Sequence, residues 1–416
     1  MAKQADLLPV DVAQRLILDQ FSRLEAEEVP LGDARGRVLA ADTVSTLNIP
    51  PFDNTSMDGF AVRSADTGGA SHRTPVALEV VVDIPAGSSA LGHIEAGQAA
   101  RIMTGGPVPA GADSVVPFEA VEEDGAVIRL TSPVSRRACV RDAGQDVTQG
   151  TTVLHAGTQL GYPQIGLLGA LGCAEILVSR RPVIAILSTG DELVAPGKTL
   201  RPGQIYNSNS PMLAAAVAEA GGVAIEVPSA RDDPEAITDA LRSVPHADLI
   251  LTSGGASVGD HDHIKGVLNA HGRVEFWRVR LRPGKPLLFG RFAEKPVIGL
   301  PGNPTSSAVT FELFVRPVIR TMLGAAPYRP RITAVVDDRI THQGGRATYV
   351  RVRLRLRDGR FHASSAGPQD SAMLVPLAHA DGLLIADEDR TEIPVGADAD
   401  VLVWRLPPEA QQFSSR

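Results

Sequence analysis

The spacing of apolar residues changes several times along the chain, and each change predicts a different kind of structure. In the stretch DVAQRLILDQFSRLEA, apolar residues recur at helical spacing, and we expect Asp11 to cap this helix. Residues 50–146 hold short alternating runs such as VALEVVVDI among many glycines and prolines, which predicts an all-β insertion. Residues 147–178 return to mixed structure, with a helix and a strand expected in QIGLLGALGCAEILV.

Strand-like and helix-like runs alternate between residues 181 and 323, which predicts parallel strands joined by right-handed crossovers. The continuous apolar run PVIAILS is typical of a strand buried on both faces. Further strands are expected in VAIEVPS, ADLILTS and KPVIGLPG. The helices are expected in SNSPMLAAAVAEAGG, DPEAITDALRSV, HDHIKGVLNAHG and NPTSSAVTFELFVRPVIRTML.

Cap residues mark the ends of two of these helices. Ser210 or Asn209 is expected to cap the first helix, and Gly221 follows its last residue. The second helix is expected to be capped by Asp233 and to start at Pro234.

After residue 330 the sequence again has the pattern of short β-strands. RITAVVDD, TYVRVRLRL, GLLIAD and DVLVWRL are short strand-like runs separated by turns. They predict a small antiparallel barrel or sandwich. The fold class is therefore α/β plus β, in several domains.

Composition narrows the class of protein. The 416 residues carry 40 Lys and Arg against 48 Asp and Glu, a net charge of −8, which argues against a nucleic-acid binder. Cys139 and Cys173 form neither a metal-ligand spacing nor a disulfide framework. The N-terminal stretch lacks the apolar core of a signal peptide, and no apolar run is long enough to span a bilayer. A cytoplasmic enzyme with no membrane attachment is the default expectation.

The loops that follow the predicted parallel strands are rich in acidic residues. These loops are STGDEL, SARDDP, TSGGASVGDHD and LPGNPTSS. Parallel strands bring their carboxyl ends to one edge of a sheet, where ligands bind, so all four loops should lie together. The acidic residues at this edge are Asp191, Glu192, Asp232, Asp233, Asp260 and Asp262.

Glycines and hydroxyls in the same loops suit a phosphate. A residue without Cβ lets a phosphate approach main-chain N–H groups, and a following helix start adds a favourable dipole. Ser188, Thr189, Ser253 and Ser257 can donate further hydrogen bonds. Carboxylates alone would repel a phosphate, but Mg²⁺ binds both kinds of oxygen. Each loop by itself is more typical of a capping turn, whereas the four together favour a phosphorylated ligand held with Mg²⁺.

Two further regions carry candidate binding groups. VRLRPGKPLLFG presents Arg282 and Lys285 around a Pro-Gly turn, which suits either an oxyanion site or a solvated hairpin. In the β insertion, PPFDNTSMDGFAVR exposes Asp58 at an irregular strand end, and RIMTGGPVPAGADSVV directs Thr104 toward a ligand. The turn RDAGQD ends at Asp146. Taken alone, each of these three segments has the residue composition of an ordinary turn.

The motifs SMDGFAVR, RIMTGGPVP, STGDEL, GQIYNSN, RDDP, SGGASVGDHD, RPGKP and GLPGNP occur in this order along the chain. In this the sequence resembles the molybdopterin molybdenumtransferases, the family of MoeA and the gephyrin E-domain. The resemblance covers nearly the whole chain, and the number of ordered motifs makes it specific, although any one motif alone is weak.

The resemblance implies a reaction, an architecture and an assembly. Molybdate is inserted into the dithiolene of adenylylated molybdopterin with the help of Mg²⁺, and AMP is released. The implied protomer is elongated. It has an N-terminal linking and dimerisation domain (1–49 and 147–179), a β insertion domain (50–146), a parallel-sheet α/β molybdopterin-binding domain (180–328) and a C-terminal β-barrel (329–416). The implied assembly is a homodimer whose cleft combines the α/β domain of one protomer with the β insertion of the other. A molybdopterin adenylyltransferase is a further implied partner.

The resemblance also assigns roles to individual residues. The catalytic residues that it implies are Asp58, Thr104, Asp146, Glu192, Asp233 and Asp262, with Glu192 and Asp233 as Mg²⁺ ligands. The molybdopterin-binding residues are Thr189, Gly190, Ser253, Gly254, Gly255 and Ser257. The molybdate-binding residues are Arg282, Lys285, Pro286, Ser306 and Arg351. Arg282 departs from the family pattern, which usually has lysine there; arginine keeps the charge but presents a planar fork.

Three other interpretations share parts of this pattern. A pyrophosphatase or deamidase of the competence-damage type shares the α/β part, but the β insertion and the C-terminal barrel argue against it. A non-catalytic scaffold of the same fold would be expected to carry a linker or a partner domain. A paralogue that uses tungstate would differ only in the fine geometry of its oxyanion site. That geometry cannot be read from the sequence.

Overall fold

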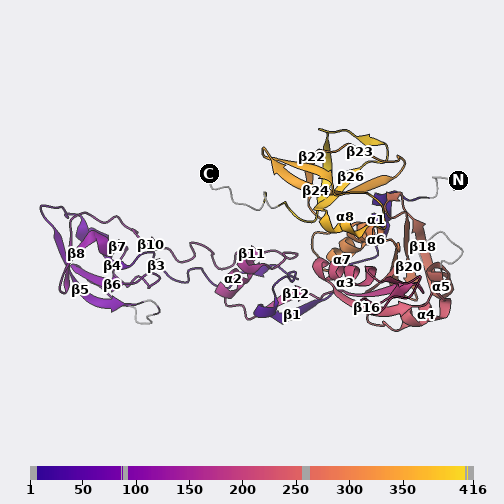
Figure 1. Cartoon of the computed structure of the whole chain (residues 1–416). Helices are drawn as coiled ribbons and strands as arrows, with labels where there is room; N and C mark the ends of the chain where they lie inside the picture. The colour runs from indigo at the N-terminus through magenta and orange to yellow at the C-terminus, as the bar shows by residue number, and fades with distance from the viewer. Residues whose placement is uncertain (1–6, 86, 88–91, 255–262, 408–409, 411–416) are drawn as a thin grey trace. The chain divides into compact units, whose positions relative to one another are not determined.

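The computed structural model describes residues 7–85, 87, 92–254, 263–407 and 410, and the chain divides into two compact units (Figure 1). Unit 1 comprises Met1–Glu28, Gly36–Ala40 and Leu177–Arg416. Unit 2 comprises Val29–Arg35 and Ala41–Ile176. Each unit has sheets and hydrophobic cores of its own. The boundaries of the four domains expected from the sequence stay a prediction.

Unit 1 is built on a six-stranded sheet. Its strands are β13 (Val183–Thr189), β16 (Val223–Ala230), β17 (Leu249–Ser253), β18 (Gly272–Arg278), β20 (Pro286–Phe292) and β21 (Lys295–Leu300). They lie in the order β16-β13-β17-β21-β20-β18. The first four are parallel, as predicted, whereas β20 and β18 run antiparallel to their neighbours. These last two strands were not predicted as members of the sheet, because the segment VRLRPGKPLLFG, which contains their connection, also suits a solvated hairpin.

The central strands are buried on both faces because alternate side chains point to opposite sides. Ile184 and Ile186 of β13 join one core, and Ala185 and Leu187 join the other. Helices cover both faces. The first core includes α1 (Val10–Leu18), α3 (Asn209–Ala220) and a continuous helical segment made of α6 (Pro304–Thr310), the π-helical turn η5 (Phe311–Val315) and α7 (Arg316–Met322). The second core includes α4 (Pro234–Arg242) and α5 (His263–His271).

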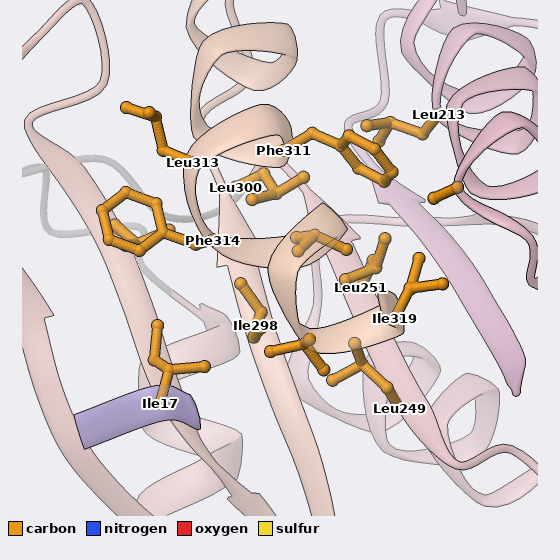
Figure 2. Packing of buried hydrophobic residues seen from close by; sticks show 14 of the residues in the cluster. Ile17, Leu213, Leu249, Leu251, Ile298, Leu300, Phe311, Leu313, Phe314 and Ile319 are labelled. Carbon is orange, nitrogen blue, oxygen red and sulfur yellow. The ribbon is translucent and has the colours of Figure 1, made fainter. Parts of the chain in front are cut away.

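The first core is dense in large aliphatic and aromatic side chains (Figure 2). Phe311 and Phe314 of η5 lie over Ile298 of β21, and Ile17 of α1 approaches the same core. All four side chains are at most 2 % exposed. Burial of a side chain of this size contributes about 1.5–3 kcal/mol, so this face anchors the strands whose ends form the site.

The helix starts agree only in part with the expected caps. Asp233 caps α4 as predicted, since its Oδ1 accepts hydrogen bonds from the amides of Glu235 (3.1 Å) and Ala236 (3.0 Å). The predicted cap of α3 is wrong, because Ser208 occupies the cap position and Asn209 is already helical. The predicted cap of α1 is also wrong. Asp11 lies inside the first turn, where it pairs with Arg15 at 3.3 Å.

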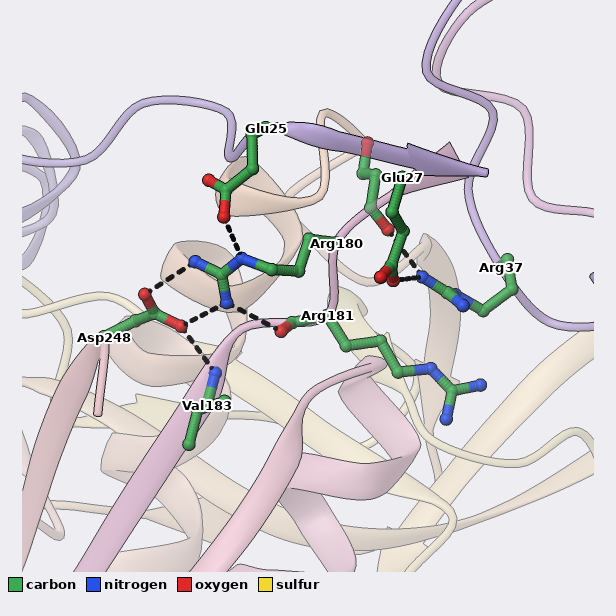
Figure 3. A network of polar contacts seen from close by, with 8 residues as sticks. Glu25, Glu27, Arg37, Arg180, Arg181, Val183 and Asp248 are labelled. Atoms are coloured by element: carbon green, nitrogen blue, oxygen red, sulfur yellow. Dashed lines mark hydrogen bonds and ion pairs between the residues drawn. The ribbon is translucent and has the colours of Figure 1, made fainter. Parts of the chain in front are cut away.

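A polar network fixes the amino ends of β13 and β17 (Figure 3). The guanidinium of Arg180 makes two hydrogen bonds of 2.9 Å to Asp248 and also pairs with Glu25. Asp248 further accepts a hydrogen bond of 2.7 Å from the amide of Val183. Burial alone would raise the pKa of Asp248, but Arg180 and the Val183 amide outweigh it and hold the pKa below its ordinary value.

The C-terminal part of unit 1 is a closed barrel, as predicted from its short strands. Its strands are β22 (Arg331–Val336), β24 (Ala347–Arg357), β25 (Arg360–Ser365), β26 (Gly382–Ala386) and β28 (Asp398–Val403). Pairing of β24 with β26 closes the circle, and β22 with β25 is the parallel pair. The short strand β19 (Leu281–Arg282) extends from the turn before β20 and pairs with the start of β24. The barrel is thereby joined to the edge of the α/β sheet.

Unit 2 is dominated by a second six-stranded sheet, which confirms the β insertion. Its strands are β4 (Gly59–Val62), β5 (Val76–Ile84), β6 (Gln98–Ile102), β7 (Ser114–Pro117), β8 (Val121–Asp124) and β9 (Val127–Leu130). Short strands β3 (Asn54–Thr55) and β10 (Val140–Arg141) pair beside it. The remainder of this unit holds β2 (Thr43–Val44), β11 (Thr152–Leu154) and α2 (Tyr162–Ala170).

Candidate active site

The four parallel strands end in register at one edge of the sheet. Ser188 of β13 lies beside Ser253 of β17, which in turn lies beside Leu300 of β21. On the other side, Thr189 lies beside Ala230 of β16. The loops that follow these strands therefore start at one edge, as the alternation of strands and helices predicted.

A cavity of about 950 Å³ lies at this edge. Its wall includes the ends of β13 and β17, the turn between β19 and β20, the start of α6 and a segment after β25. The predicted site residues that line it are Thr189, Gly190, Glu192, Ser253, Gly254, Arg282, Lys285, Pro286 and Ser306. One cavity thus brings together groups that are up to about a hundred residues apart in the sequence.

Two glycines shape the floor of the cavity. Gly254 has φ +92°, and a Cβ there would meet the carbonyl oxygen of Thr189 at 2.7 Å. Gly190 has φ +145°, and a Cβ there would meet the carboxylate of Glu192 at 2.6 Å. At Gly254 the contact is with main chain, so glycine is required for the approach of the two strand ends. At Gly190 the positive φ favours glycine, and an added Cβ would displace the Glu192 carboxylate.

Amide side chains hold the strand ends together. Asn209 donates hydrogen bonds to the hydroxyl of Ser253 (2.8 Å) and to the carbonyl of Gly302 (2.7 Å). Asn207 donates to the hydroxyl of Ser229 at 3.2 Å. These contacts join the loops after β16, β17 and β21, so the edge that bears the site is rigidly built.

Two carboxylates line the cavity, but they are not the expected pair. Glu192 and Asp232 line the cavity, and of the two only Glu192 is exposed. Asp233 does not line the cavity, because its carboxylate turns away to cap α4. Oδ1 of Asp232 is buried and has no hydrogen-bond partner among the described residues. The sequence placed Asp232 at this edge but did not single it out, since either aspartate of the pair fits a helix cap.

Three cationic side chains also line the cavity: Arg282, Lys285 and Arg346. The parallel pairing of β19 with β24 places Arg282 beside Thr348 and so brings Arg346 near it. Arg282 donates a hydrogen bond of 2.7 Å to Gln343. Burial, together with the neighbouring charge of Arg282, lowers the pKa of Arg346. Arg346 was not predicted, because only the pairing of a barrel strand with the β19–β20 turn brings it to the site.

Other predicted residues lie elsewhere. Arg351 is 1 % exposed and does not line the cavity. The cavity is lined instead by Gln369, Ser371 and Ala372. These three residues lie close together in the sequence and were not predicted. Gly255, Ser257 and Asp262 lie outside the described residues.

Asp58, Thr104 and Asp146 belong to unit 2, where all three are exposed. Asp58 precedes β4 and Thr104 follows β6, and the pairing of these strands brings the two residues together. Oδ1 of Asp58 accepts hydrogen bonds of 2.7 Å from both the amide and the hydroxyl of Thr104. These donors, the amide above all, hold the pKa of Asp58 below its ordinary value. The carboxylate is therefore ionised and fixed in direction at the tip of its turn.

The described residues hold neither a ready-made metal cluster nor a membrane-spanning helix. No group of three or more His, Cys, Asp or Glu side chains in the described part of the chain is arranged to hold a metal ion by itself. No helix within the described ranges is long and apolar enough to cross a membrane.

Comparison with known families matches three successive parts of the chain. Residues 8–172 match the MoeA N-terminal region (domain I and II), and residues 185–321 match a probable molybdopterin binding domain. Residues 333–404 match the MoeA C-terminal region (domain IV).

Individual relatives extend the match over nearly the whole chain. Molybdopterin molybdenumtransferase 2 of Mycobacterium tuberculosis is 42% identical, over 94% of this chain and 98% of the relative. The molybdopterin molybdenumtransferase of a Nostoc species is 40% identical, over 93% and 90%. Among solved structures, the molybdopterin biosynthesis MoeA protein of Pyrococcus horikoshii OT3 superposes with a TM-score of 0.83 at 30% identity. That match covers 96% of this chain and all of the other.

Proposed function

This chain belongs to the molybdopterin molybdenumtransferase (MoeA) family and is a transferase of molybdenum cofactor biosynthesis, and we propose that it inserts molybdate into adenylylated molybdopterin with Mg²⁺-dependent release of AMP. In the reaction an oxygen of water or of molybdate attacks the phosphoanhydride, whose P–O bond breaks to release AMP. The two dithiolene sulfurs bind molybdenum and replace oxygen of molybdate, which leaves as water with the thiol protons. The family membership was predicted from the ordered motifs, and the domain matches bear it out.

A single observation supports the proposal: one cavity is lined by carboxylates, hydroxyls and cations together. Glu192 and Asp232 line it, as do Arg282, Lys285 and Arg346. A substrate that carries a phosphoanhydride and meets a separate oxyanion needs both the carboxylates, for a cation, and the cationic side chains. A cavity of about 950 Å³ also falls in the range of sites for small-molecule ligands.

The phosphate groups are proposed to bind at the glycine-containing strand ends. Thr189 and Ser253 are buried residues that line the cavity, and Gly190 and Gly254 leave main chain accessible beside them. Hydroxyl and amide donors stabilise phosphate oxygens without adding bulk.

The donor set fits Mg²⁺ as a partner of the substrate. Two carboxylates line the cavity, and Oδ1 of Asp232 has no hydrogen-bond partner among described residues. Mg²⁺ is commonly held by one or two carboxylates together with substrate phosphates, so a larger protein cluster is not required. Glu192 and Asp232 are the residues proposed to hold it, in place of the pair Glu192 and Asp233. When bound, it would neutralise negative charge on the phosphate oxygens.

The residues of the chain supply the remaining functions. Arg282 and Lys285 are proposed to bind molybdate, with Ser306 as a hydroxyl donor in the same cavity. Concentrating both substrates in one cavity removes the entropic cost of bringing them together. The fixed guanidinium of Arg282 and the ammonium of Lys285 also favour the dianion over neutral solutes.

The unit 2 residues are proposed to act in a homodimer, in which Asp58 of one protomer reaches the cavity of the other. Asp58 is ionised and oriented by Thr104, which supports a role in positioning a substrate. The homodimer and a molybdopterin adenylyltransferase partner rest on the family resemblance, a cytoplasmic location rests on the composition of the sequence, and all three stay predictions. Light scattering tests the homodimer, since a stable active monomer would contradict a site shared between two protomers.

The decisive experiment incubates the purified protein with adenylylated molybdopterin, with and without Mg²⁺, and with molybdate or tungstate. Release of AMP that requires both Mg²⁺ and molybdate is the expected result. A clear preference for tungstate would identify the alternative paralogue. No AMP release under any of these conditions, from protein that binds the nucleotide, would favour the scaffold alternative.

A further inference from the structure

An apolar strip, made of Leu193, Ile205 and Tyr206, lines part of the cavity. These residues belong to two short strands, β14 (Leu193–Val194) and β15 (Ile205–Tyr206), which pair in parallel. Ile205 is 55 % exposed and Tyr206 is 45 % exposed, so the chain leaves much of their surface uncovered. Large apolar side chains that are exposed together in a cavity are typical of a binding surface.

Hydrogen bonds hold the apolar strip in place. The main-chain amide of Ile205 donates to the carbonyl of Glu192 at 2.9 Å. The hydroxyl of Tyr206 donates to the carbonyl of Lys198 at 2.8 Å, which satisfies the polar end of the ring. The strip is therefore preformed, and it is attached to the residue that is proposed to hold Mg²⁺.

Tyr206 also brings an aromatic ring to the cavity. Among the described residues that line the cavity, it is the one aromatic side chain. The face of an aromatic ring binds planar heteroaromatic rings by stacking. The chemistry of the strip thus suits a flat, nitrogen-containing ring better than a phosphate or an oxyanion.

Two residues that line the cavity have a buried polar atom without a hydrogen-bond partner in the described part of the chain. These atoms are Oγ1 of Thr189 and Oδ1 of Asn209. The side-chain nitrogen of Asn209 is used by Ser253 and Gly302, so its oxygen is left as an acceptor. A buried acceptor without a partner is costly unless a ligand or water donates to it. Ribose hydroxyls are donors of this kind.

The proposed substrate carries two planar ring systems, a pterin and an adenine, on the two sides of its phosphoanhydride. The dithiolene is attached to the pterin side and must reach the molybdate, which is proposed to bind at Arg282 and Lys285. The adenosine side has no such obligation. It carries both a flat base and ribose hydroxyls, which match the apolar strip and the unpartnered acceptor.

We propose that the apolar strip is the subsite for the adenine base, with Tyr206 stacking on the base and Ile205 and Leu193 extending the apolar contact. The inference rests on the proposed function, because that function supplies the nucleotide. It adds a base-binding subsite, and it explains how the cavity retains a nucleotide in preference to a phosphate alone. Its occupation can be measured with AMP, without the pterin.

The first test measures binding of AMP and of ribose 5-phosphate to the full chain by titration calorimetry in the presence of Mg²⁺. The wild type should bind AMP more tightly than ribose 5-phosphate. Tyr206→Ala should weaken AMP binding by about 5- to 100-fold, the range for loss of a base–aromatic stack, and should leave ribose 5-phosphate binding unchanged. Tyr206→Phe keeps the ring and should lose little.

The matched control is Tyr328→Ala. Tyr328 is 46 % exposed, close to the value for Tyr206, and it does not line the cavity. This variant should bind AMP like the wild type. Hydrogen exchange at the Ile205 amide shows whether β14 and β15 stay paired in Tyr206→Ala. If they separate, Ile205→Ala replaces it, because this change shortens the strip and keeps both the main-chain pairing and the ring of Tyr206.

The second test uses fluorescence as a signature of stacking. Tyr206→Trp should still bind AMP, and AMP should quench the fluorescence of the new indole. Ribose 5-phosphate should leave that fluorescence unchanged, because it has no base. Quenching by AMP that is no greater than in the wild type would show that the base does not contact this position.

The remaining outcomes are also decisive. AMP binding by Tyr206→Ala that equals the control would refute the subsite, and an equal loss for AMP and ribose 5-phosphate would refute a contact with the base. Loss of 6-hydroxymethylpterin binding in Tyr206→Ala, with AMP binding unchanged, would assign the strip to the pterin and overturn the adenine subsite. AMP binding that depends on Tyr206, in a protein that releases no AMP from adenylylated molybdopterin, would instead refute the proposed function and leave this inference standing.

Discussion

The two edges of the α/β sheet in unit 1 use charged residues in opposite ways. At the amino edge, Asp248 is bound by Arg180 through two hydrogen bonds of 2.9 Å and by a main-chain amide. At the carboxyl edge, Glu192 and Asp232 share a cavity with three cations. Among the described residues, no ion pair joins any of these five side chains to another charged group.

The difference indicates what each group is for. A carboxylate whose acceptors are filled by its own chain contributes to stability and is closed to ligands. Charged groups of both signs that line one cavity without pairing keep their capacity for a substrate, at some expense in stability. Pairing within the chain therefore distinguishes structural charges from functional ones more reliably than charge or burial does.

The largest expected effect comes from Glu192→Ala. Release of AMP should fall by about 100- to 1000-fold, because a carboxylate proposed to hold Mg²⁺ is lost. Urea denaturation should give an unchanged free energy of unfolding, since no residue in the described part of the chain forms a hydrogen bond with the Glu192 side chain. Asp239→Ala, at an exposed position of α4, is the control. Full AMP release by the Glu192 variant would show that the reaction does not depend on this carboxylate of the carboxyl edge.

Asp58 tests whether the unit 2 turn completes the site across a homodimer. Asp58→Ala alone should lower AMP release by about 10- to 100-fold, because substrate positioning is impaired. When Asp58→Ala and Glu192→Ala proteins are unfolded, mixed and refolded together, about a quarter of wild-type activity should return, since half of the dimers regain one intact site. A mixture no more active than its components would show that the two residues act in one chain or not together.

Asp248→Asn addresses the structural edge. Loss of the charged pair with Arg180 should lower the free energy of unfolding by about 1–3 kcal/mol, while AMP release per folded molecule stays at the wild-type level. The folded-state pKa of Asp248 lies below its ordinary value, so its contribution is present above about pH 4 and is lost as the pH falls through the folded pKa. The stability difference between wild type and variant should therefore shrink on acidification. A variant of full stability that releases no AMP would reverse the assignment of the two edges.

Gly190→Ala sharpens the role of the turn that carries Glu192. The φ of +145° is strained for alanine, so stability should fall by about 1–3 kcal/mol. A Cβ would also meet the Glu192 carboxylate at 2.6 Å and displace it, so AMP release should fall as well. Gly197→Ala is a matched control, since its φ is also positive (+88°) but nothing lies within 4 Å of the added Cβ. The control should lose stability without the loss of activity. Equal activity losses in both variants would mean that displacement of Glu192 is not the cause.

The smallest expected effect concerns the carboxylate of unit 2. Thr104→Val removes the hydroxyl donor but keeps the amide donor, so the pKa of Asp58 should rise part of the way toward its ordinary value. NMR titration of the Asp58 carboxyl measures the change. An unchanged pKa would show that the main-chain amide alone sets it.

Much of the fold follows from periodicity, because burial on both faces requires continuous apolar runs. The four parallel strands and the barrel strands β22, β24, β26 and β28 were predicted this way. Asp233 was predicted as the cap of α4 from its place before Pro234. Strands β18, β20 and β25 were not predicted as members of a sheet, and each pairs antiparallel with a strand close to it in the sequence.

The sequence by itself determined which loops gather at the carboxyl edge, since the direction of parallel strands fixes where their ends lie. It also determined the family, through the order of the motifs. Only the tertiary structure decided which of two adjacent aspartates faces the cavity, and which of two arginines near β24 does so. Adjacent residues have the same local propensities, and their directions depend on a helix cap and on a strand pairing with a distant segment.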